Sequence, residues 1–152
     1  MARMHTRRRG KSGSKKPDRV GVPDWVTYTP QDVEEIIVKL AKDGNNPSTI
    51  GIILRDRYGI PDVRPLLGMK MTAVLEKNGA PLKLPEDIQS LINKSVALSA
   101  HLEKHKKDNH NRRGLFLIES KIRRLTKYYI RSGKLPKDWR YDPQTARLLV
   151  SK

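Results

Sequence analysis

Apolar residues recur three and four positions apart along two long stretches in the second half of the chain. The first stretch, LPEDIQSLINKSVALSAHLEKH, begins its helix at Pro85, and the second covers residues 112–131. Their apolar stripes are Ile88, Leu91, Ile92, Leu98 and Leu102, and Leu115, Ile118, Ile122, Leu125 and Tyr129. This spacing is typical of α-helices with one buried face. Because only the polar turn KKDNHN separates the stretches, they are predicted to form an antiparallel helical hairpin.

Shorter helices are predicted in the first half of the chain, where proline, threonine and glycine mark their ends. The expected starts are Thr29-Pro30 and Asn46-Pro47, and the expected stops are Gly44 and Gly59. The inward positions are Val33, Ile36, Ile37 and Leu40 in the first helix, and Ile50, Ile53 and Leu54 in the second. A loop containing Pro61 and Pro65 should then lead to a short helix over residues 70–78.

The pattern as a whole predicts an all-α protein. A last short helix, QTARLLV, should follow Asp142-Pro143, and no alternation typical of a strand and no internal repeat is present. We expect a basic tail over residues 1–24, a small helical N-terminal domain over residues 25–83, and a helical domain with a C-terminal extension over residues 84–152. The tail, rich in Gly, Ser, Lys and Arg, has too few apolar residues to fold alone.

The distribution of charge indicates what kind of partner the protein binds. The net charge is +16, and the isoelectric point is about 10.3. Residues 1–20 carry eight Lys and Arg against one Asp, residues 101–134 carry eleven against three acids, and residues 21–100 carry nine against ten. Two basic blocks around a nearly neutral middle indicate two contact zones on one polyanion, and an isoelectric point above about 9 is typical of nucleic-acid binding.

Composition also excludes several classes of protein. The chain has no cysteine, which rules out disulfides, thiolate zinc sites and cysteine nucleophiles. The basic start, MARMHTRRRGKSGSKK, is not followed by an apolar segment, so it is not a secretory signal. No window of about 18 apolar residues exists, so no membrane span is expected. A membrane-surface role would need Trp or Phe opposite a basic face, and neither is expected on the face of the long basic helix.

The turn HLEKHKKDNHNRRGLF concentrates the candidate chemistry. His101 and His105 share a helix face, as zinc ligands often do, and His110 could add a third ligand. The surrounding lysines and arginines repel a dication, however, and no second carboxylate lies nearby. A catalytic His–Asp pair would need a cleft that excludes water, which a hairpin tip does not offer. Neither a metal site nor an enzyme is therefore expected, and no cofactor is implied.

Recognition of RNA explains the turn better than a solvated loop does, because it also accounts for the lone aspartate among the bases. Asp108 can accept a hydrogen bond from the N2 amino group that guanine displays in a minor groove. His101 and Asn111 can reach 2′-hydroxyls or base edges, and the neighbouring cations can hold phosphates. The second long helix adds a basic row with a tyrosine: Arg113, Lys121, Arg124, Tyr128 and Arg131. Either this row binds RNA, or it is a solvated face with Tyr128 half-buried in the core.

A DNA-binding regulator is the alternative from another class. The segment PSTIGIILRDRYGIPDVRPLLGMKMTAVLEKNG has the helix–turn–helix pattern. Its candidate recognition helix, around residues 70–77, is nearly neutral, whereas a module that faces phosphates should be basic. We therefore interpret this region as a small helical domain that packs on RNA or on a neighbouring protein.

The residues of the turn carry a family resemblance. HLEKHKKDNHNRRGL resembles the signature HxxxHKKDxHxRRGL of the universal small-subunit ribosomal protein fifteen family, and ESKIRRLTKYY resembles its continuation. The stretches MARMHTRRRGKSGS, IGIILRDRYGIP and KLPKDWRYDPQTARLLV resemble the longer archaeal and eukaryotic form, with the turn closer to archaeal members. The resemblance thereby extends over essentially the whole chain.

The resemblance implies a cytoplasmic, all-helical constituent of the small ribosomal subunit that binds its rRNA early in assembly. The family binds a three-way junction and a G·U/G·C element in a minor groove, and it lies near the large subunit and neighbouring ribosomal proteins. His101, His105 and Asp108 match the minor-groove set, and Arg124 and Tyr128 match the junction-binding helix. Asn111 stands where bacterial members usually have Ser. The bacterial Thr-Gly and Gln junction residues do not align with KLPEDIQ without a gap and are not transferred, although Gln89 is a weak candidate.

Taken together, the residues and the resemblance predict an RNA-binding protein that is not an enzyme and takes no small-molecule substrate. The expected RNA contacts come from the turn, the second long helix and the tail. They are His101, His105, Lys106, Lys107, Asp108, His110, Asn111, Arg112, Arg113, Lys121, Arg124, Tyr128 and Arg131, with Arg7, Arg8, Arg9 and Lys11 in the tail.

Overall fold

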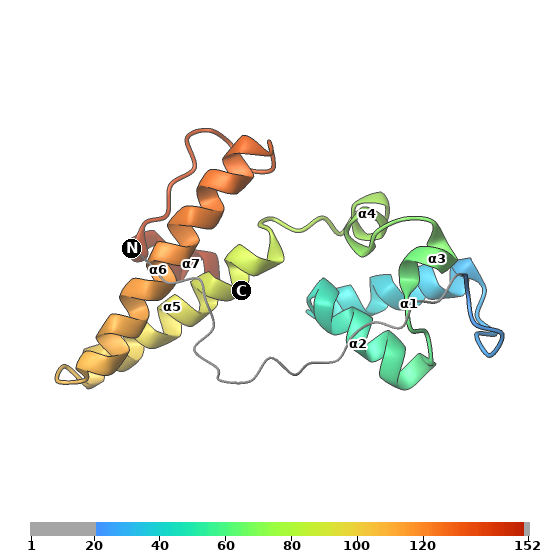
Figure 1. Cartoon of the computed structure of the whole chain (residues 1–152), viewed down its shortest axis with the longest axis horizontal. Helices are drawn as coiled ribbons and strands as arrows, with labels where there is room; N and C mark the ends of the chain where they lie inside the picture. Colours follow the sequence, from blue (N-terminus) through green and yellow to red (C-terminus); the bar gives the residue numbers. More distant parts are fainter. Residues whose placement is uncertain (1–20, 151–152) are drawn as a thin grey trace. The chain divides into compact units, whose positions relative to one another are not determined.

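The computed structural model describes residues 21–150, and within that range the chain forms seven helices and no strand (Figure 1). The helices are α1 (Pro30–Lys42), α2 (Pro47–Tyr58), α3 (Val63–Leu67), α4 (Met71–Lys77), α5 (Glu86–Lys104), α6 (Asn109–Arg131) and α7 (Pro143–Val150). The predicted all-α class is confirmed. The expected tail contacts Arg7, Arg8, Arg9 and Lys11 lie outside the described residues. The described residues divide into two compact units, 21–83 and 84–150.

Local sequence signals set the helix ends in the first unit. Thr29 caps α1, because its hydroxyl accepts the Asp32 backbone N–H at 3.3 Å while the Asp32 carboxylate accepts the Thr29 N–H at 3.1 Å. Gly59 ends α2 in the left-handed region, with a φ of 68°. The core of this unit consists of Val33, Ile37, Ile50, Leu54, Ile60, Val63, Val74 and Leu75.

Two predicted boundaries were wrong. The loop expected around Pro61 and Pro65 contains helix α3, whose N-cap Asp62 accepts the Arg64 backbone N–H at 3.2 Å. Pro65 is tolerated there because the N–H groups of a first helical turn have no intrahelical partner. The second long helix begins at Asn109 rather than at residue 112, because Asp108 caps it.

In the second unit, α5 and α6 run antiparallel as the predicted hairpin, and α7 packs along α5 (Figure 1). The core consists of Ile88, Ile92, Ile122, Leu135 and Ala146. Gly114 brings the two long helices close, since a Cβ there would lie 3.7 Å from the Leu98 side chain. The extension is tied back to α5, with the hydroxyls of Ser95 and Tyr141 3.0 Å apart and an ion pair between Arg147 and Glu103.

The end of the hairpin opposite the turn is closed by a hydrogen bond between its two helices. The Tyr129 hydroxyl of α6 donates to the Asp87 carboxylate of α5 at 2.7 Å, and the Lys134 ammonium lies 5.6 Å from the centre of the Tyr129 ring. Burial, together with the Asp87 carboxylate, raises the pKa of Tyr129 to about 12. The hydroxyl therefore stays protonated and remains a donor at neutral pH. The hairpin is thus fixed at this end, and the turn lies at the other.

Candidate RNA-binding surface

The hairpin turn is a hydrogen-bonded structure built by the residues that surround it. His105 caps the C-terminus of α5, and its N–H donates to the His101 carbonyl at 2.9 Å. The Asp108 N–H donates to the His105 carbonyl at 3.1 Å. The Arg112 guanidinium donates to the Lys106 carbonyl at 2.6 Å and to the Asn109 side chain at 3.1 Å. Arg112 therefore helps to hold the turn in place.

Asp108 sits at the centre of this structure, where its carboxylate accepts three hydrogen bonds. Oδ1 accepts the Asn111 backbone N–H at 2.9 Å, and Oδ2 lies 2.7 Å from the Asn111 side-chain nitrogen and 3.2 Å from His101 Nε2. These bonds, led by the Asn111 backbone N–H, lower the pKa of Asp108 to about 2. A carboxylate has about four acceptor positions, so one remains, on Oδ1.

This arrangement corrects one step of the sequence argument. RNA recognition alone was offered there as the reason for a lone aspartate among many bases. The N-cap of α6 accounts for an aspartate at position 108 without any RNA. Its side chain nevertheless keeps 29% of its surface exposed, and His101 keeps 39%. Both groups are therefore accessible to a partner as well as important for the turn.

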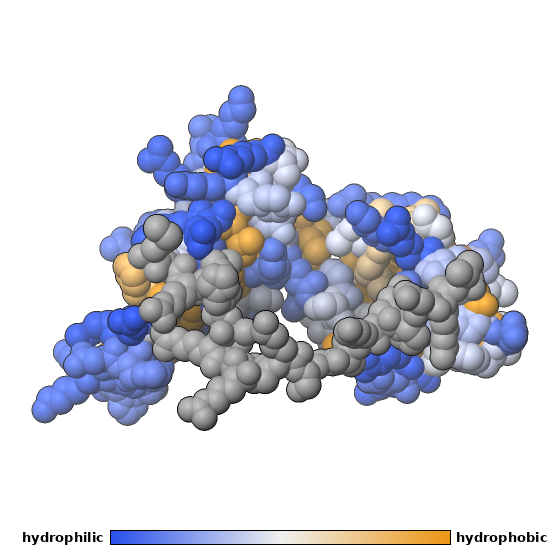
Figure 2. Space-filling view, in the orientation of Figure 1, coloured by the Kyte–Doolittle hydropathy of each residue, from blue (hydrophilic) through white to orange (hydrophobic). Residues whose placement is uncertain are grey.

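Five of the predicted turn residues line one shallow concavity at this end of the hairpin together with Lys104, which was not predicted, whereas His110, Asn111 and Arg112 are not part of its lining. A hollow of about 540 Å³ is lined by His101, Lys104, His105, Lys106, Lys107 and Asp108. The rings of His101 and His105 lie against each other, with their centroids 4.5 Å apart. Figure 2 shows this end of the hairpin as hydrophilic. Within residues 21–150, no three His, Asp or Glu side chains come together in a way that could hold a metal ion.

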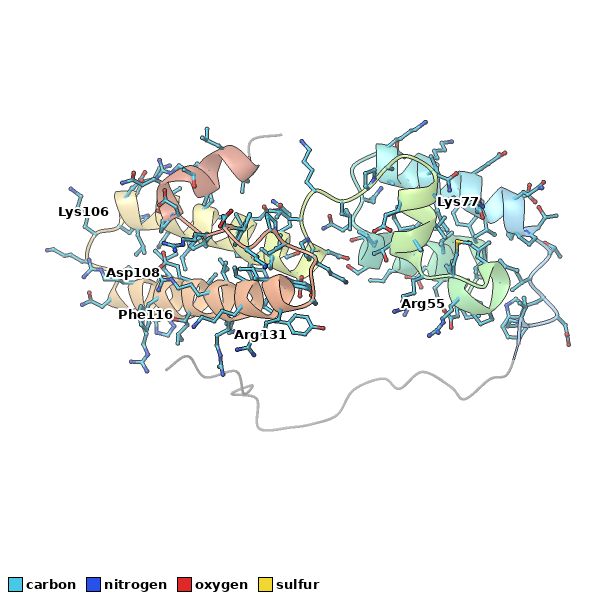
Figure 3. The ribbon with its side chains drawn as sticks, turned by 90° about the horizontal axis from the view of Figure 1, so that it is seen from above. Arg55, Lys77, Lys106, Asp108, Phe116 and Arg131 are labelled. Atoms are coloured by element: carbon cyan, nitrogen blue, oxygen red, sulfur yellow. The ribbon has the colours of Figure 1, made fainter. Side chains whose placement is uncertain are left out.

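The outer face of α6 is basic along its length. Ten positions of α6 are exposed, of which six are Arg or Lys, two are aromatic and none is acidic. They are Asn109, His110, Arg112, Arg113, Phe116, Arg123, Arg124, Lys127, Tyr128 and Arg131. Arg131 projects from the side of α6 that faces away from α5 (Figure 3). Of the predicted row, only Lys121 is partly buried.

Tyr128 belongs to this surface, and the alternative that placed it half-buried in the core is wrong. Its side chain is 60% exposed. The ring meets Tyr129 edge-on, with the centroids 5.1 Å apart, and Tyr129 in turn anchors the hairpin through Asp87. Tyr128 therefore presents a ring to solvent from a fixed part of α6.

The sequence analysis missed Phe116, which is 57% exposed on the same helix. The expectation that neither Trp nor Phe would lie on the face of the basic helix was wrong. A helical wheel carries the signal, because Phe116 falls outside the buried stripe that contains Leu115 and Ile118. Phe116 does not support a membrane-surface role, since it lies within the basic face and the apolar face of α6 is packed on α5. Within residues 21–150, no helix is long and apolar enough to span a bilayer.

The structure of the first unit disfavours the DNA-binding alternative. The candidate recognition helix is α4, which buries Val74 and Leu75 in the core. Within α4 the one cation, Lys77, donates to both carboxylate oxygens of Glu34 at 3.1 Å. The other cation of residues 70–77, the exposed N-cap Lys70, is matched in number by the acidic Glu76. A helix whose cation is already paired offers little to DNA phosphates.

Comparison with known proteins places the whole chain among small-subunit proteins. Residues 1–60 match the family described as the ribosomal S13/S15 N-terminal domain, and residues 71–149 match ribosomal protein S15. The small ribosomal subunit protein uS15 of Hyperthermus butylicus is 55% identical over 145 residues, which cover 95% of this chain and 90% of that one. The uS15 proteins of Methanocella arvoryzae and Methanoculleus marisnigri are 49% and 45% identical over the full length of both chains.

Proposed function

The chain belongs to the ribosomal protein S15 family of the small ribosomal subunit, and from this premise we propose that it binds small-subunit rRNA through the hairpin turn and the outer face of α6. Members of this family are structural ribosomal proteins rather than enzymes. The observation that carries the proposal is the exposed face of α6, which has six Arg and Lys residues and no acid. Such a face suits phosphates and repels cations. The protein then works in the cytoplasm as part of the small subunit.

The turn supplies the contact that reads bases. Asp108 keeps one acceptor position on Oδ1, which suits the N2 amino group of a guanine in a shallow A-form minor groove. When His101 donates Nε2–H to Asp108, the neutral ring has Nδ1 left as an acceptor for a ribose 2′-hydroxyl. Lys106 and Lys107 lie on the rim of the same hollow, where they can hold the flanking phosphates. This geometry fits a G·U/G·C element.

The outer face of α6 supplies the contact that recognises the shape of the RNA. Arg113, Arg124 and Arg131 are exposed along the helix and can follow a phosphate backbone. Tyr128 adds a ring that can stack on an unpaired base and a hydroxyl that can bond to ribose or phosphate. Because a three-way junction offers both bent backbones and unpaired bases, it is the RNA that we assign to this face.

The remaining contacts are assigned to other neighbours in the ribosome. Arg7, Arg8, Arg9 and Lys11 bind rRNA phosphates, in keeping with their charge. Residues 21–83 carry eight Lys and Arg against eight Asp and Glu, so this unit suits neighbouring ribosomal proteins better than it suits RNA. The resemblance also assigns the chain a contact with the large subunit.

The proposal is tested by measuring affinity for two RNAs and one DNA across a salt series. These are a small-subunit rRNA three-way junction that contains the G·U/G·C element, a plain RNA duplex, and a DNA duplex of equal length. We expect the junction to bind at least about a hundredfold more tightly, and the preference to persist as salt rises, because base and shape contacts release fewer counterions than phosphate contacts do. Equal affinities that fall together with salt would overturn the proposal.

A second arm tests the minor-groove contact with an RNA that carries inosine in place of the guanine. Inosine lacks the N2 amino group, so wild type should bind the inosine RNA about 5- to 100-fold less tightly. The Asp108→Ala variant should bind the two RNAs equally, because its acceptor is gone. A variant that still discriminates between the RNAs would show that another group reads this base.

A further inference from the structure

Phe116 has a large apolar side chain that the fold leaves exposed. It is the one phenylalanine of the chain, and it is 57% exposed. Within residues 21–150, its ring neither stacks on another aromatic ring nor lies under a cation. Its backbone carbonyl accepts the Ser120 hydroxyl at 2.8 Å, which turns that small side chain back toward the helix. The ring is thus left exposed on the outer face of α6.

The surroundings of Phe116 are basic. Arg112 and Arg113 precede it by one helical turn, and Arg123 and Lys127 follow on the same side of α6. The nearest acid along the helix, Glu119, is mostly buried and forms an ion pair with Arg123 at 3.5 Å. An exposed ring between cations is poorly placed to meet an apolar protein surface, because the cations would have to lose water without gaining a partner. Phosphates would supply that partner.

The chemistry of the ring limits which part of an RNA it can contact. Phenylalanine has no hydrogen-bonding group, so it cannot read a base edge or a 2′-hydroxyl. It gains free energy by covering a flat surface, and in RNA that surface is the face of a base. Base faces inside a duplex are already covered by their neighbours. Only an unpaired or splayed base is therefore available to the ring.

We propose that Phe116 stacks on an unpaired base of the bound rRNA, as a specificity contact separate from that of Tyr128. This contact rests on the proposed rRNA binding. Phe116 and Tyr128 are twelve positions apart, which corresponds to about 18 Å along the helix and about 120° around it. Two rings so placed cannot share one stack of bases. Helix α6 therefore touches two separate RNA segments, one on each side of its central line of arginines, Arg113, Arg124 and Arg131.

The test compares three substitutions at position 116 in the full-length protein, on the junction RNA described above. Phe116→Leu keeps apolar bulk but has no π face, Phe116→Ala removes the side chain, and Phe116→Trp keeps an aromatic ring. We expect the Leu and Ala variants to bind about 5- to 100-fold less tightly, and the Trp variant to bind as wild type does. The Ile52→Ala variant is a matched control, because Ile52 is 52% exposed on α2, in the other unit.

Two further readouts separate stacking from a general loss of structure. Leu and Ala both favour helices, so the thermal unfolding of these variants should match that of wild type. Chemical probing of the RNA should find an unpaired nucleotide that wild type protects and Phe116→Leu leaves reactive. In the same assay, Tyr128→Leu should leave a different nucleotide reactive, because it removes the ring that we assign to the other stack.

The possible failures are distinguishable. If wild type shows no preference for the junction, the proposed function fails whatever position 116 does. If wild type prefers the junction but the Leu and Ala variants bind it equally well, the stacking contact alone is overturned, and the ring is left to a protein partner. If Leu binds as wild type and only Ala is weaker, the contact is apolar packing rather than stacking, and the inference is likewise overturned.

Discussion

The Asp108 carboxylate accepts hydrogen bonds from Asn111 and His101 within the protein itself. Three of its acceptor positions stabilise the turn, and one on Oδ1 is left over. A substitution at this position therefore changes both the hairpin and its surface. The inosine comparison removes that ambiguity, because it asks whether Asp108 matters more for one RNA than for another, whatever its effect on folding.

The pH dependence of stability isolates the structural part of this residue. The folded pKa of Asp108 is lowered to about 2, below its ordinary value of 3.8. Its contribution to the free energy of unfolding is therefore complete above about pH 4 and is lost as the pH falls toward about 2. We expect wild type to lose more stability than Asp108→Ala across this window, so that the two curves converge at low pH.

The measurement is urea unfolding of the second unit, followed by Trp139 fluorescence in a Trp25→Phe background. Trp139 packs against the core of residues 84–150, whereas Trp25 belongs to the other unit. The substitution removes the hydrogen bond from the Trp25 indole to the Gly59 carbonyl at 3.1 Å, a contact of the first unit, and wild type and Asp108→Ala are compared in the same background. A constant difference between wild type and Asp108→Ala from neutral to acid pH would mean that the three hydrogen bonds do not favour the charged carboxylate.

At the scale of the element, Gly114 offers a test of how closely α5 and α6 pack. A Cβ at this position would lie 3.7 Å from Leu98, which is an ordinary contact distance. Alanine should therefore fit, and it should raise the free energy of unfolding by about 0.5–1 kcal/mol, because glycine is the poorer helix former. Valine should instead lower it, since its branched side chain would press on Leu98.

The same urea titration checks both variants. The Ala variant acts as the control for the Val variant, because both lose the glycine and only one adds bulk. A Gly114→Ala protein less stable than wild type would contradict the geometry. It would mean that a Cβ at this position lies closer to Leu98 than 3.7 Å. RNA affinity should stay unchanged for Ala, since Gly114 is not among the exposed positions of α6.

The elements also show which features could be predicted from the sequence. The ends of α1 and α2 followed from caps and prolines, because those signals act within a few residues. The hairpin followed from two long apolar stripes and a short turn. Helix α3 was missed because two prolines were taken as loop signals, although the first turn of a helix accepts proline.

The site was less predictable, because its geometry depends on contacts between elements. The residues of the turn could be selected from their types, but the bond from His101 to Asp108 spans seven positions and needs the observed bend. The exposure of Tyr128 could not be decided before it was known which face of α6 packs on α5. The exposure of Phe116 was predictable from the helical wheel, because its position falls outside the stripe that contains Leu115 and Ile118.

At the scale of the whole molecule, basic charge is distributed unevenly along the chain. Residues 84–150 carry fifteen Lys and Arg against seven Asp and Glu, while residues 21–83 are balanced at eight against eight. Among the described residues, the buried core positions lie between Val33 and Ala146. Residues 1–20 carry eight Lys and Arg against one acid and have few apolar residues. The stability of the fold and the charge of the tail should therefore be separable by experiment.

Removal of residues 1–20 should weaken RNA binding only by removing phosphate contacts, so the affinity should become less dependent on salt. If Arg7, Arg8, Arg9 and Lys11 each contact a phosphate, the slope of log affinity against log salt should become shallower by about 3–4, because each contact releases a little less than one counterion. The denaturant midpoint should not change. Substituting the four cations by Gln in the full-length chain is the matched control, since it removes the charge and keeps the length. An unchanged slope in both proteins would mean that the tail touches no phosphate and that the second basic block, residues 101–134, supplies the electrostatic part of binding by itself.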